Sequence, residues 1–273
     1  MDRGLEPPPA PGNAGPMTTT RNHPLSDRTA VITGATSGIG AATARRLAAD
    51  GAHVALLGRR EDRLKALADE LRPTAPGTVL PLAVDLTAPD ALATAADTIR
   101  STLGRVDLVV ANGGVMLGAP FETAATDEWD RMLDTNLRAL LHTARTFTDD
   151  LIATAAEGRP ADLVHVGSVA GHVLYPNWSV YAATKAAVAH LTRNLRAELG
   201  PRDVRVKNVE PGVTLTELGE DMHDRDMRQT LTRMRTTLRP LAPEDIAEAI
   251  AYAVAAPPHV NIAELVVVPV QQG

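Results

Sequence analysis

Residues 29–40 read Thr-Ala-Val-Ile-Thr-Gly-Ala-Thr-Ser-Gly-Ile-Gly, a β-branched run that passes directly into a glycine-rich turn. Residues 29–33 predict a strand, and the helix formers of residues 41–50 predict a helix that ends at Gly51. Glycines at a strand-to-helix turn let the backbone approach a pyrophosphate, whose charge the helix N-terminus favours. The spacing Gly34-xxx-Gly38-x-Gly40 differs from the usual G-x-G-x-x-G. By itself this turn leaves nucleotide binding and a purely structural role equally open.

Downstream, short apolar runs alternate with amphipathic stretches, which is typical of βαβ units and a parallel sheet. The alternation predicts one α/β domain over residues 25–273, with seven strands. The further strands are expected over residues 53–57, 79–84, 106–111, 163–166, 204–209 and 265–268. A further helix is expected after Gly58-Arg59-Arg60 and through Leu71, and others over residues 89–103, 127–156, 179–199 and 243–256.

The composition argues against several classes of function. A net charge of -6 provides no basic face for nucleic acid and no polybasic membrane anchor. The chain has no cysteine, and its eight histidines do not fall at metal-ligand spacing, so no metal site is expected. No apolar run approaches the roughly 20 residues of a membrane span, and a cytoplasmic protein is predicted.

Residues 1–24 are rich in Pro, Gly, Asn and Thr and lack apolar periodicity, which predicts a disordered tail or linker. Met17 can be an alternative start, or the segment can be the remnant of a fusion to an upstream domain.

Chemically distinctive residues follow several of the predicted strands. After the second strand, Gly58-Arg59-Arg60 replaces the acidic residue of NAD-specific folds and suits a 2′-phosphate; the alternative is a solvated helix start. Asn136 lies on an apolar helical face, where a structural amide is the alternative to a catalytic one. Tyr181 and Lys185 are four residues apart and share a helical face, which would also suit a surface pair.

Residues 212–240, which we call the substrate segment, carry several methionines and leucines. They are interpreted either as plain core or as a lid over a hydrophobic ligand.

Six motifs in this order resemble the short-chain dehydrogenase/reductase family. They are Thr33-Gly34-xxx-Gly38-Ile39-Gly40, Asn112-Gly113-Gly114, Asn136, Ser168, Tyr181-xxx-Lys185 and Pro211-Gly212-xxx-Thr216. The resemblance covers the chain from about Thr29 to its end. It implies a single-domain Rossmann fold, a parallel sheet in the strand order 3-2-1-4-5-6-7, and commonly a tetramer (or dimer) built through paired helices that include the Tyr181 helix. The family's usual Asn-Asn-Ala-Gly is here Ala111-Asn112-Gly113-Gly114.

The resemblance also implies a role for each matching residue. Tyr181 would be the catalytic acid/base and Lys185 its modulator and a ligand of the nicotinamide ribose. Ser168 would orient the carbonyl, and Asn136 would hold a proton-relay water. The implied cofactor contacts are Gly34, Ser37, Gly38, Ile39, Gly40, Gly58, Arg59, Arg60, Asp85, Leu86, Asn112, Gly113, Tyr181, Lys185, Pro211, Gly212, Thr214 and Thr216.

This set suits carbonyl reduction. Hydride addition leaves an alkoxide that must receive a proton. An unperturbed phenol, with a pKa of about 10, does not readily lose and regain its proton near neutral pH. A nearby ammonium and a positive nicotinamide ring would favour the phenolate. Ser168 can donate to the same oxygen.

Gly58-Arg59 resembles the NADPH-preferring members of the family, so NADP(H) is the predicted cofactor and reduction the predicted direction. A mostly apolar substrate pocket is expected, which favours a bulky hydrophobic ketone or aldehyde. Its predicted residues are Met116, Val169, Gly171, His172, Trp178, Val213 and Met222.

Residues 114–118 and 210–218 resemble antibiotic-pathway reductases, including clavulanate dehydrogenase and the ketoreductases that tailor angucycline polyketides. An aromatic polyketide ketone is therefore the first substrate prediction and a small aldehyde the second. The N-terminal linker would suit a fusion to, or association with, an upstream oxygenase. An NADPH-binding regulatory protein without turnover is the alternative from another functional class.

Overall fold

Seven parallel strands form one sheet in the computed structural model, which describes residues 23–272. The strands are β1 (Thr29–Thr33), β2 (His53–Gly58), β3 (Val79–Ala83), β4 (Leu108–Ala111), β5 (Ala161–Val166), β6 (Val204–Pro211) and β7 (Glu264–Val267). Their order, β3-β2-β1-β4-β5-β6-β7, confirms the predicted strand order. Because the order reverses between β1 and β4, the loops after these strands diverge and leave a crevice at the carboxyl ends.

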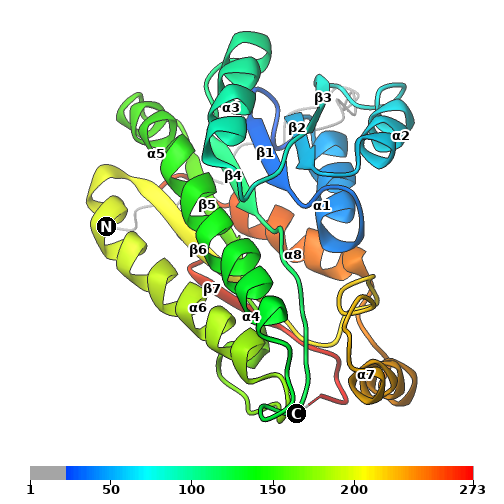
Figure 1. The fold of residues 1–273 in the computed structure, drawn as a ribbon. Helices are drawn as coiled ribbons and strands as arrows, with labels where there is room; N and C mark the ends of the chain where they lie inside the picture. The colour runs from blue at the N-terminus through cyan, green and yellow to red at the C-terminus, as the bar shows by residue number, and fades with distance from the viewer. Residues whose placement is uncertain (1–22, 273) are drawn as a thin grey trace, which may run out of the picture.

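Helices cover both faces of the sheet (Figure 1). One layer contains α1 (Gly38–Ala49), α2 (Glu61–Leu71) and α8 (Pro243–Val254). The other contains α3 (Pro89–Leu103), α5 (Ala139–Ala156) and α6 (Ser179–Leu199). The helix α7 (Arg225–Thr237) belongs to the substrate segment and stands apart from both layers in Figure 1.

The central strands are buried on both faces, which explains their near-continuous apolar sequences. Every residue of β1 is buried, and successive side chains point to opposite layers. Ile32 packs in the core beneath α1 and α8, whereas Val31 packs with Phe147 of α5. The sheet therefore divides the core into two clusters and presents its carboxyl edge to the loops.

A buried network of charged side chains joins the amino ends of the central strands. Asp162, in β5, accepts a hydrogen bond from Arg28 (2.8 Å) and two from Arg205 (2.9 and 2.7 Å). Lys207 Nζ lies 3.3 Å from the same carboxylate, and Arg28 also donates to Asp107 (2.6 Å). All five residues are at most 7% exposed, so three cations and two anions are held away from water. Its members lie far apart in the chain, so local sequence patterns do not predict this network.

The helix expected over residues 127–156 is present and contains a π-helical turn. It divides into α4 (Thr126–Met132), a π-helical turn (Leu133–Arg138) and α5. A π-turn inserts an extra residue into the helix, and such turns occur frequently at functional sites. This one coincides with Asn136, whose side chain bonds the backbone of Val115 in the loop after β4. The predicted long helix is therefore confirmed in its extent, and the π-helical turn within it was not predicted.

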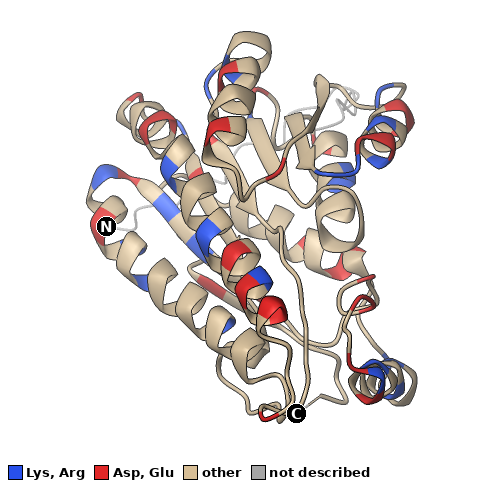
Figure 2. Ribbon diagram, viewed as in Figure 1, with Lys and Arg blue, Asp and Glu red and all other residues tan. Residues whose placement is uncertain are grey.

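The predicted tail, residues 1–24, lies outside the described residues except for His23 and Pro24, and it stays a prediction. Among the helices that the structure describes, none has the length and apolar character needed to cross a bilayer. Figure 2 shows basic and acidic residues interspersed over the visible helices, including α7, which carries both.

Candidate active site

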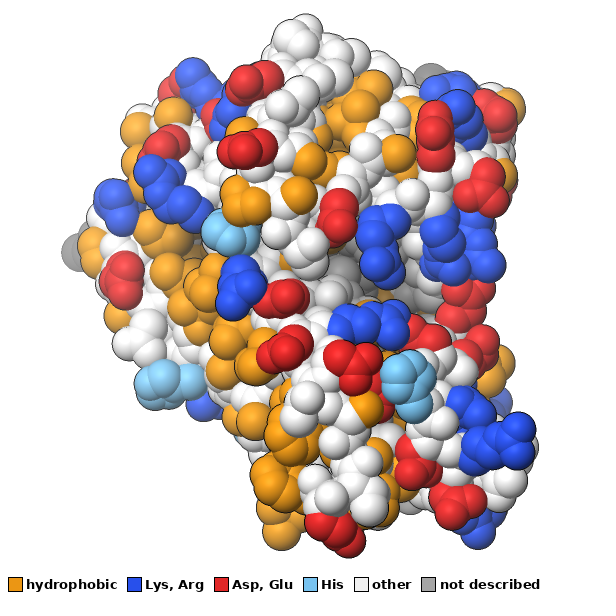
Figure 3. Space-filling model, in the orientation of Figure 1, with side chains coloured by type: hydrophobic (Ala, Val, Ile, Leu, Met, Phe, Trp, Pro, Cys, Tyr) orange, Lys and Arg blue, Asp and Glu red, His pale blue; other side chains and the backbone are white. Residues whose placement is uncertain are grey.

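The loops after β1, β2, β3, β4, β5 and β6 converge on one cleft of about 620 Å³. This volume lies within the range of small-molecule and cofactor sites. In the space-filling view (Figure 3), a hollow lies above the part of the molecule that contains α7. Both basic and acidic side chains lie at its rim. The described residues include no group of three or more His, Asp or Glu side chains arranged to hold a metal ion.

The glycines of the first loop each meet a steric requirement. Gly34 and Gly38 have positive φ angles of 66° and 52°, which L side chains rarely adopt. A Cβ at Gly40 would lie 2.3 Å from the carbonyl oxygen of Gly34. Gly34, Ser37, Gly38 and Ile39 line the cleft, whereas Gly40 is buried behind them and serves the packing of the turn. The loop leads directly into α1, whose N-terminus is suited to an anionic group.

Arg60 lies at the end of the cleft formed by the glycine loop and β2. Its Nη2 donates to Thr36 Oγ1 (2.7 Å) and Ser37 Oγ (2.8 Å), and its Nη1 donates to Glu217 Oε2 (2.8 Å). Arg59 also lines the cleft but is exposed. A Cβ at Gly58 would lie 2.7 Å from Thr36 Cγ2, so glycine is needed for Thr36 to take this position.

Asp85 and Leu86 line the cleft after β3. Hydrogen bonds from the backbone and side chain of Thr87 hold the pKa of the Asp85 carboxyl below its usual range, and Arg59 adds to this effect. The carboxylate is therefore ionised and fixed at the rim at neutral pH.

The loop after β4 is fastened to β1 by Thr33. The Thr33 hydroxyl accepts hydrogen bonds from the backbone nitrogens of Asn112 (2.9 Å) and Gly113 (3.1 Å), and Asn112 Nδ2 donates to the Thr33 carbonyl (3.0 Å). Both loop residues line the cleft. The flexible Asn-Gly-Gly sequence is thus held in place by a side chain from the neighbouring strand.

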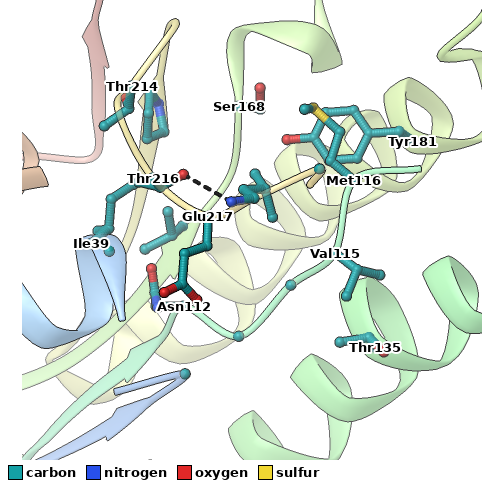
Figure 4. A pocket seen from close by; sticks show the side chains of 18 of the residues that line it. Ile39, Asn112, Val115, Met116, Thr135, Ser168, Tyr181, Thr214, Thr216 and Glu217 are labelled. Atoms are coloured by element: carbon teal, nitrogen blue, oxygen red, sulfur yellow. Dashed lines mark hydrogen bonds between the residues drawn. The ribbon is translucent and has the colours of Figure 1, made fainter. Parts of the chain in front are cut away.

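Tyr181 and Ser168 face the same part of the cavity in Figure 4, although they come from α6 and from the end of β5. Tyr181 is 5% exposed, and burial raises the pKa of its phenol to about 12 while a hydrogen bond with Ser168 opposes this rise. The phenol is consequently protonated at neutral pH and can donate a proton.

Lys185 lies one helical turn after Tyr181. Its Nζ donates to the carbonyl of Val166 (2.9 Å) and lies 5.9 Å from the centroid of the Tyr181 ring. Burial lowers the pKa of the ammonium to about 8. A group with this pKa is mostly charged at pH 7, so the lysine can stabilise a phenolate beside it.

Asn136 does not line the cleft; its neighbour Thr135 does. The Asn136 side chain joins three other groups: Oδ1 accepts from Val115 N (2.8 Å), and Nδ2 donates to Val115 O (2.9 Å) and Thr184 Oγ1 (3.1 Å). The amide therefore clamps the loop after β4 to α6. The structure places it among its partners as a satisfied structural amide, and a water-holding role for it stays a proposal.

The other half of the cleft is mainly apolar. Met116, Val169, Trp178 and Val213 line it, together with Pro211, Gly212, Thr214 and Thr216 of the sixth strand and the substrate segment. Three residues predicted for this pocket lie outside its lining. Gly171 packs on the backbone of Lys185, His172 Nε2 lies 2.6 Å from Glu210 Oε2, and Met222 is fully buried in the adjacent apolar cluster.

Several lining residues were not identified from the sequence, because their neighbours are distant in the chain. Gln272 Oε1 accepts from Val213 N (2.8 Å), and its Nε2 donates to the hydroxyl of Tyr175 (2.8 Å), 97 residues away. Charged residues also enter the lining, and none of them was among the predicted residues of the mostly apolar pocket. They are Arg131, Glu217, Glu220, Asp221 and Arg235.

A family model, two relatives and a solved structure are similar to this chain. The family model for short chain dehydrogenase matches residues 28–226. An uncharacterised oxidoreductase of Staphylococcus aureus (strain MRSA252) is 35% identical over 246 residues, which are 90% of this chain and 99% of the relative. Sulfoacetaldehyde reductase 2 of Chromohalobacter salexigens is 38% identical over 243 residues, 89% and 94% of the two chains.

Among solved structures, the alcohol dehydrogenase of the archaeon Thermococcus sibiricus complexed with 5-hydroxy-NADP is similar, with a TM-score of 0.79 and 30% identity. The match covers 90% of this chain and 98% of that one.

Proposed function

This chain belongs to the short-chain dehydrogenase/reductase family of oxidoreductases acting on CH-OH and C=O groups, and on that premise we propose that it reduces a ketone with NADPH. The observation that carries the proposal is the meeting of Tyr181, Ser168 and Lys185 in the wall of a cleft that also contains the glycine loop. The proposed product is a secondary alcohol.

The roles of the residues follow from their positions. When bound, the nicotinamide group would supply hydride to the carbonyl carbon. Tyr181 would give its hydroxyl proton to the carbonyl oxygen, and the hydroxyl of Ser168 would hold that oxygen in place. Lys185 would stabilise the phenolate that remains.

The residues present fit an NADP-type cofactor. The glycine loop and the N-terminus of α1 suit a pyrophosphate, and Arg60 with Ser37 suits a 2′-phosphate. The complex of the Thermococcus sibiricus enzyme with 5-hydroxy-NADP supports this choice. We assign the main phosphate contact to Arg60, because hydrogen bonds to Thr36 and Ser37 hold its guanidinium beside the glycine loop. Arg59 also lines the cleft and is proposed as a second contact. A charge-assisted contact of this kind favours NADPH over NADH by about ten- to a hundredfold.

For the substrate, we place a bulky hydrophobic ketone first, of the aromatic polyketide type found in antibiotic biosynthesis. The apolar lining around Met116, Val169 and Trp178 supports it.

A small aldehyde is the second candidate, and Arg235 favours an anionic one. Its side chain is 13% exposed and lines the cleft, where Nη2 donates to the Leu218 carbonyl (2.7 Å) and Nη1 lies 3.9 Å from Glu220. The similarity to sulfoacetaldehyde reductase points the same way.

The test is consumption of NADPH and of NADH against polycyclic quinone ketones, small neutral aldehydes and sulfonated aldehydes. We expect NADPH to be consumed with at least one carbonyl compound, and NADH to be the poorer donor. Equal dissociation constants for the two nucleotides would contradict the cofactor assignment. NADPH binding without turnover on any carbonyl would support the non-catalytic regulatory alternative.

The rate of reduction should fall as the pH rises through about 8. Burial lowers the pKa of Lys185 to about 8, so the ammonium is charged below that pH and neutral above it. Tyr181, with a pKa of about 12, stays protonated over the same interval. When Lys185 loses its charge it no longer stabilises the phenolate, although Tyr181 still carries the proton to be donated. A kcat that stays constant from pH 6.5 to 9.5 at saturating NADPH would contradict this prediction.

We also propose assembly into a homotetramer, or a dimer. The support is that large apolar side chains are exposed on three described elements: Leu141 of α5 (41%), Tyr252 of α8 (68%) and Val266 of β7 (58%). Association with an upstream oxygenase rests on the N-terminal residues alone.

A further inference from the structure

The cleft contains a carboxylate of the protein itself at the point where the proposed cofactor would place a phosphate. Glu217, in the substrate segment, accepts from Arg60 Nη1 (2.8 Å) with one oxygen and from Arg63 Nη1 (2.6 Å) with the other. The two arginines precede Glu217 by 157 and 154 residues. A carboxylate that bridges two guanidinium groups occupies donors that would equally serve a phosphate.

Arg60 is held at this position by the glycine loop. Its Nη2 donates to Thr36 Oγ1 (2.7 Å) and Ser37 Oγ (2.8 Å), so the guanidinium is fixed beside the loop that would carry the cofactor. The hydroxyl of Ser37 adds a further donor for an anion. A 2′-phosphate and the Glu217 carboxylate would therefore draw on the same guanidinium.

The substrate segment lies directly over the glycine loop at this point. A Cβ at Gly38 would lie 3.0 Å from Thr216 Cγ2, which shows how closely the residue before Glu217 approaches the loop. Figure 4 shows Glu217 projecting into the cavity beside Thr216. The ion pairs thus fasten one end of the substrate segment to the cofactor half of the cleft.

The pairs are weak enough to exchange. The side chains of Arg60, Arg63 and Glu217 are 40%, 43% and 45% exposed, and ion pairs exposed to this degree contribute little to stability. Hydrogen bonds from Arg60 and Arg63 lower the pKa of Glu217, so the carboxylate is ionised at neutral pH. Glu217 therefore carries a full negative charge at neutral pH, and another anion can replace it at the two arginines.

We propose that Glu217 is an internal counter-anion that competes with the 2′-phosphate of an NADP-type cofactor for Arg60 and Arg63. Cofactor binding would then detach this end of the substrate segment from α2. The inference rests on the proposed function, in that NADPH is taken as the cofactor. It predicts that removal of the carboxylate charge strengthens binding only of ligands that carry a 2′-phosphate.

The experiment is titration of wild type and Glu217→Gln with 2′,5′-ADP, 5′-AMP, NADPH and NADH. In the variant the dissociation constants of 2′,5′-ADP and NADPH should fall by about three- to tenfold, because two exposed ion pairs no longer compete. Those of 5′-AMP and NADH should change by less than about twofold.

Glu70→Gln is the matched control. Glu70 lies on α2 and pairs with Arg45 at 2.7 and 2.8 Å, with side-chain exposures of 43% for Arg45 and 51% for Glu70. It should leave all four constants unchanged.

An unchanged NADPH constant in Glu217→Gln would overturn the inference. A raised constant would also overturn it, since the carboxylate would then be holding the arginines in place for the phosphate. If wild type binds and turns over NADPH but the variant shows no selective gain, the inference fails and the proposed function stands. If wild type binds neither NADPH nor 2′,5′-ADP, both fail.

Discussion

Replacement of Tyr181 by phenylalanine is expected to lower kcat for carbonyl reduction by about 10²- to 10⁴-fold, the contribution typical of a positioned general acid. The substitution removes one hydroxyl from a side chain that is 5% exposed and leaves the ring in its packing. Ser168 remains as a donor to the carbonyl oxygen, but no other phenol is positioned beside Lys185 in the described part of the chain. NADPH binding should be retained, because the glycine loop and Arg60 are untouched.

The measurement is kcat from NADPH absorbance, together with the dissociation constant of NADPH by fluorescence. Tyr175→Phe is a matched control within the same cleft. Its hydroxyl accepts a hydrogen bond from Gln272, and loss of one neutral hydrogen bond should cost about tenfold at most. Wild-type turnover by Tyr181→Phe would overturn the assignment of the proton donor.

Replacement of Asp162 by asparagine is expected to lower the free energy of unfolding by about 3–5 kcal/mol, the range found when one partner of a buried ion pair is removed. Asp162 is fully buried and is contacted by Arg28, Arg205 and Lys207. In the variant, Asp107 would be the only anion left in this network of described residues, facing three buried cations. The uncompensated charges, rather than the lost hydrogen bonds alone, produce the large effect.

Urea unfolding followed by circular dichroism measures this difference. The matched control is Asp149→Asn, which removes an ion pair with Arg145 in which both side chains are more than 70% exposed. That change should cost less than about 1 kcal/mol. Equal midpoints for the two variants would show that the buried network does not stabilise the fold.

Much of the fold could be predicted from local pattern. The strand β1, the glycine turn and α1 follow one another in sequence, so propensity and spacing are sufficient to place them. The positions of Tyr181 and Lys185 on one helical face were predictable for the same reason, because a four-residue spacing sets their relation. The seven-stranded order followed from the family resemblance and is confirmed by the structure.

Other features depend on residues that meet only in the folded chain. Arg28 and Asp162 are 134 residues apart, and Arg60 and Glu217 are 157 apart. No local periodicity links such partners, since each looks like an ordinary surface charge in its own stretch of sequence. Asn136 likewise looks like one polar residue on an apolar helix until the loop after β4 packs against it.

The residue types needed for hydride and proton transfer could thus be recognised in linear order, because their chemistry and spacing are local properties. Only the folded chain shows which arginine faces the glycine loop and which carboxylate pairs with it. It also shows which polar residues are buried and which line the cleft. Those outcomes depend on distances between strands and loops that are far apart in the sequence and on the burial that packing imposes on each charge.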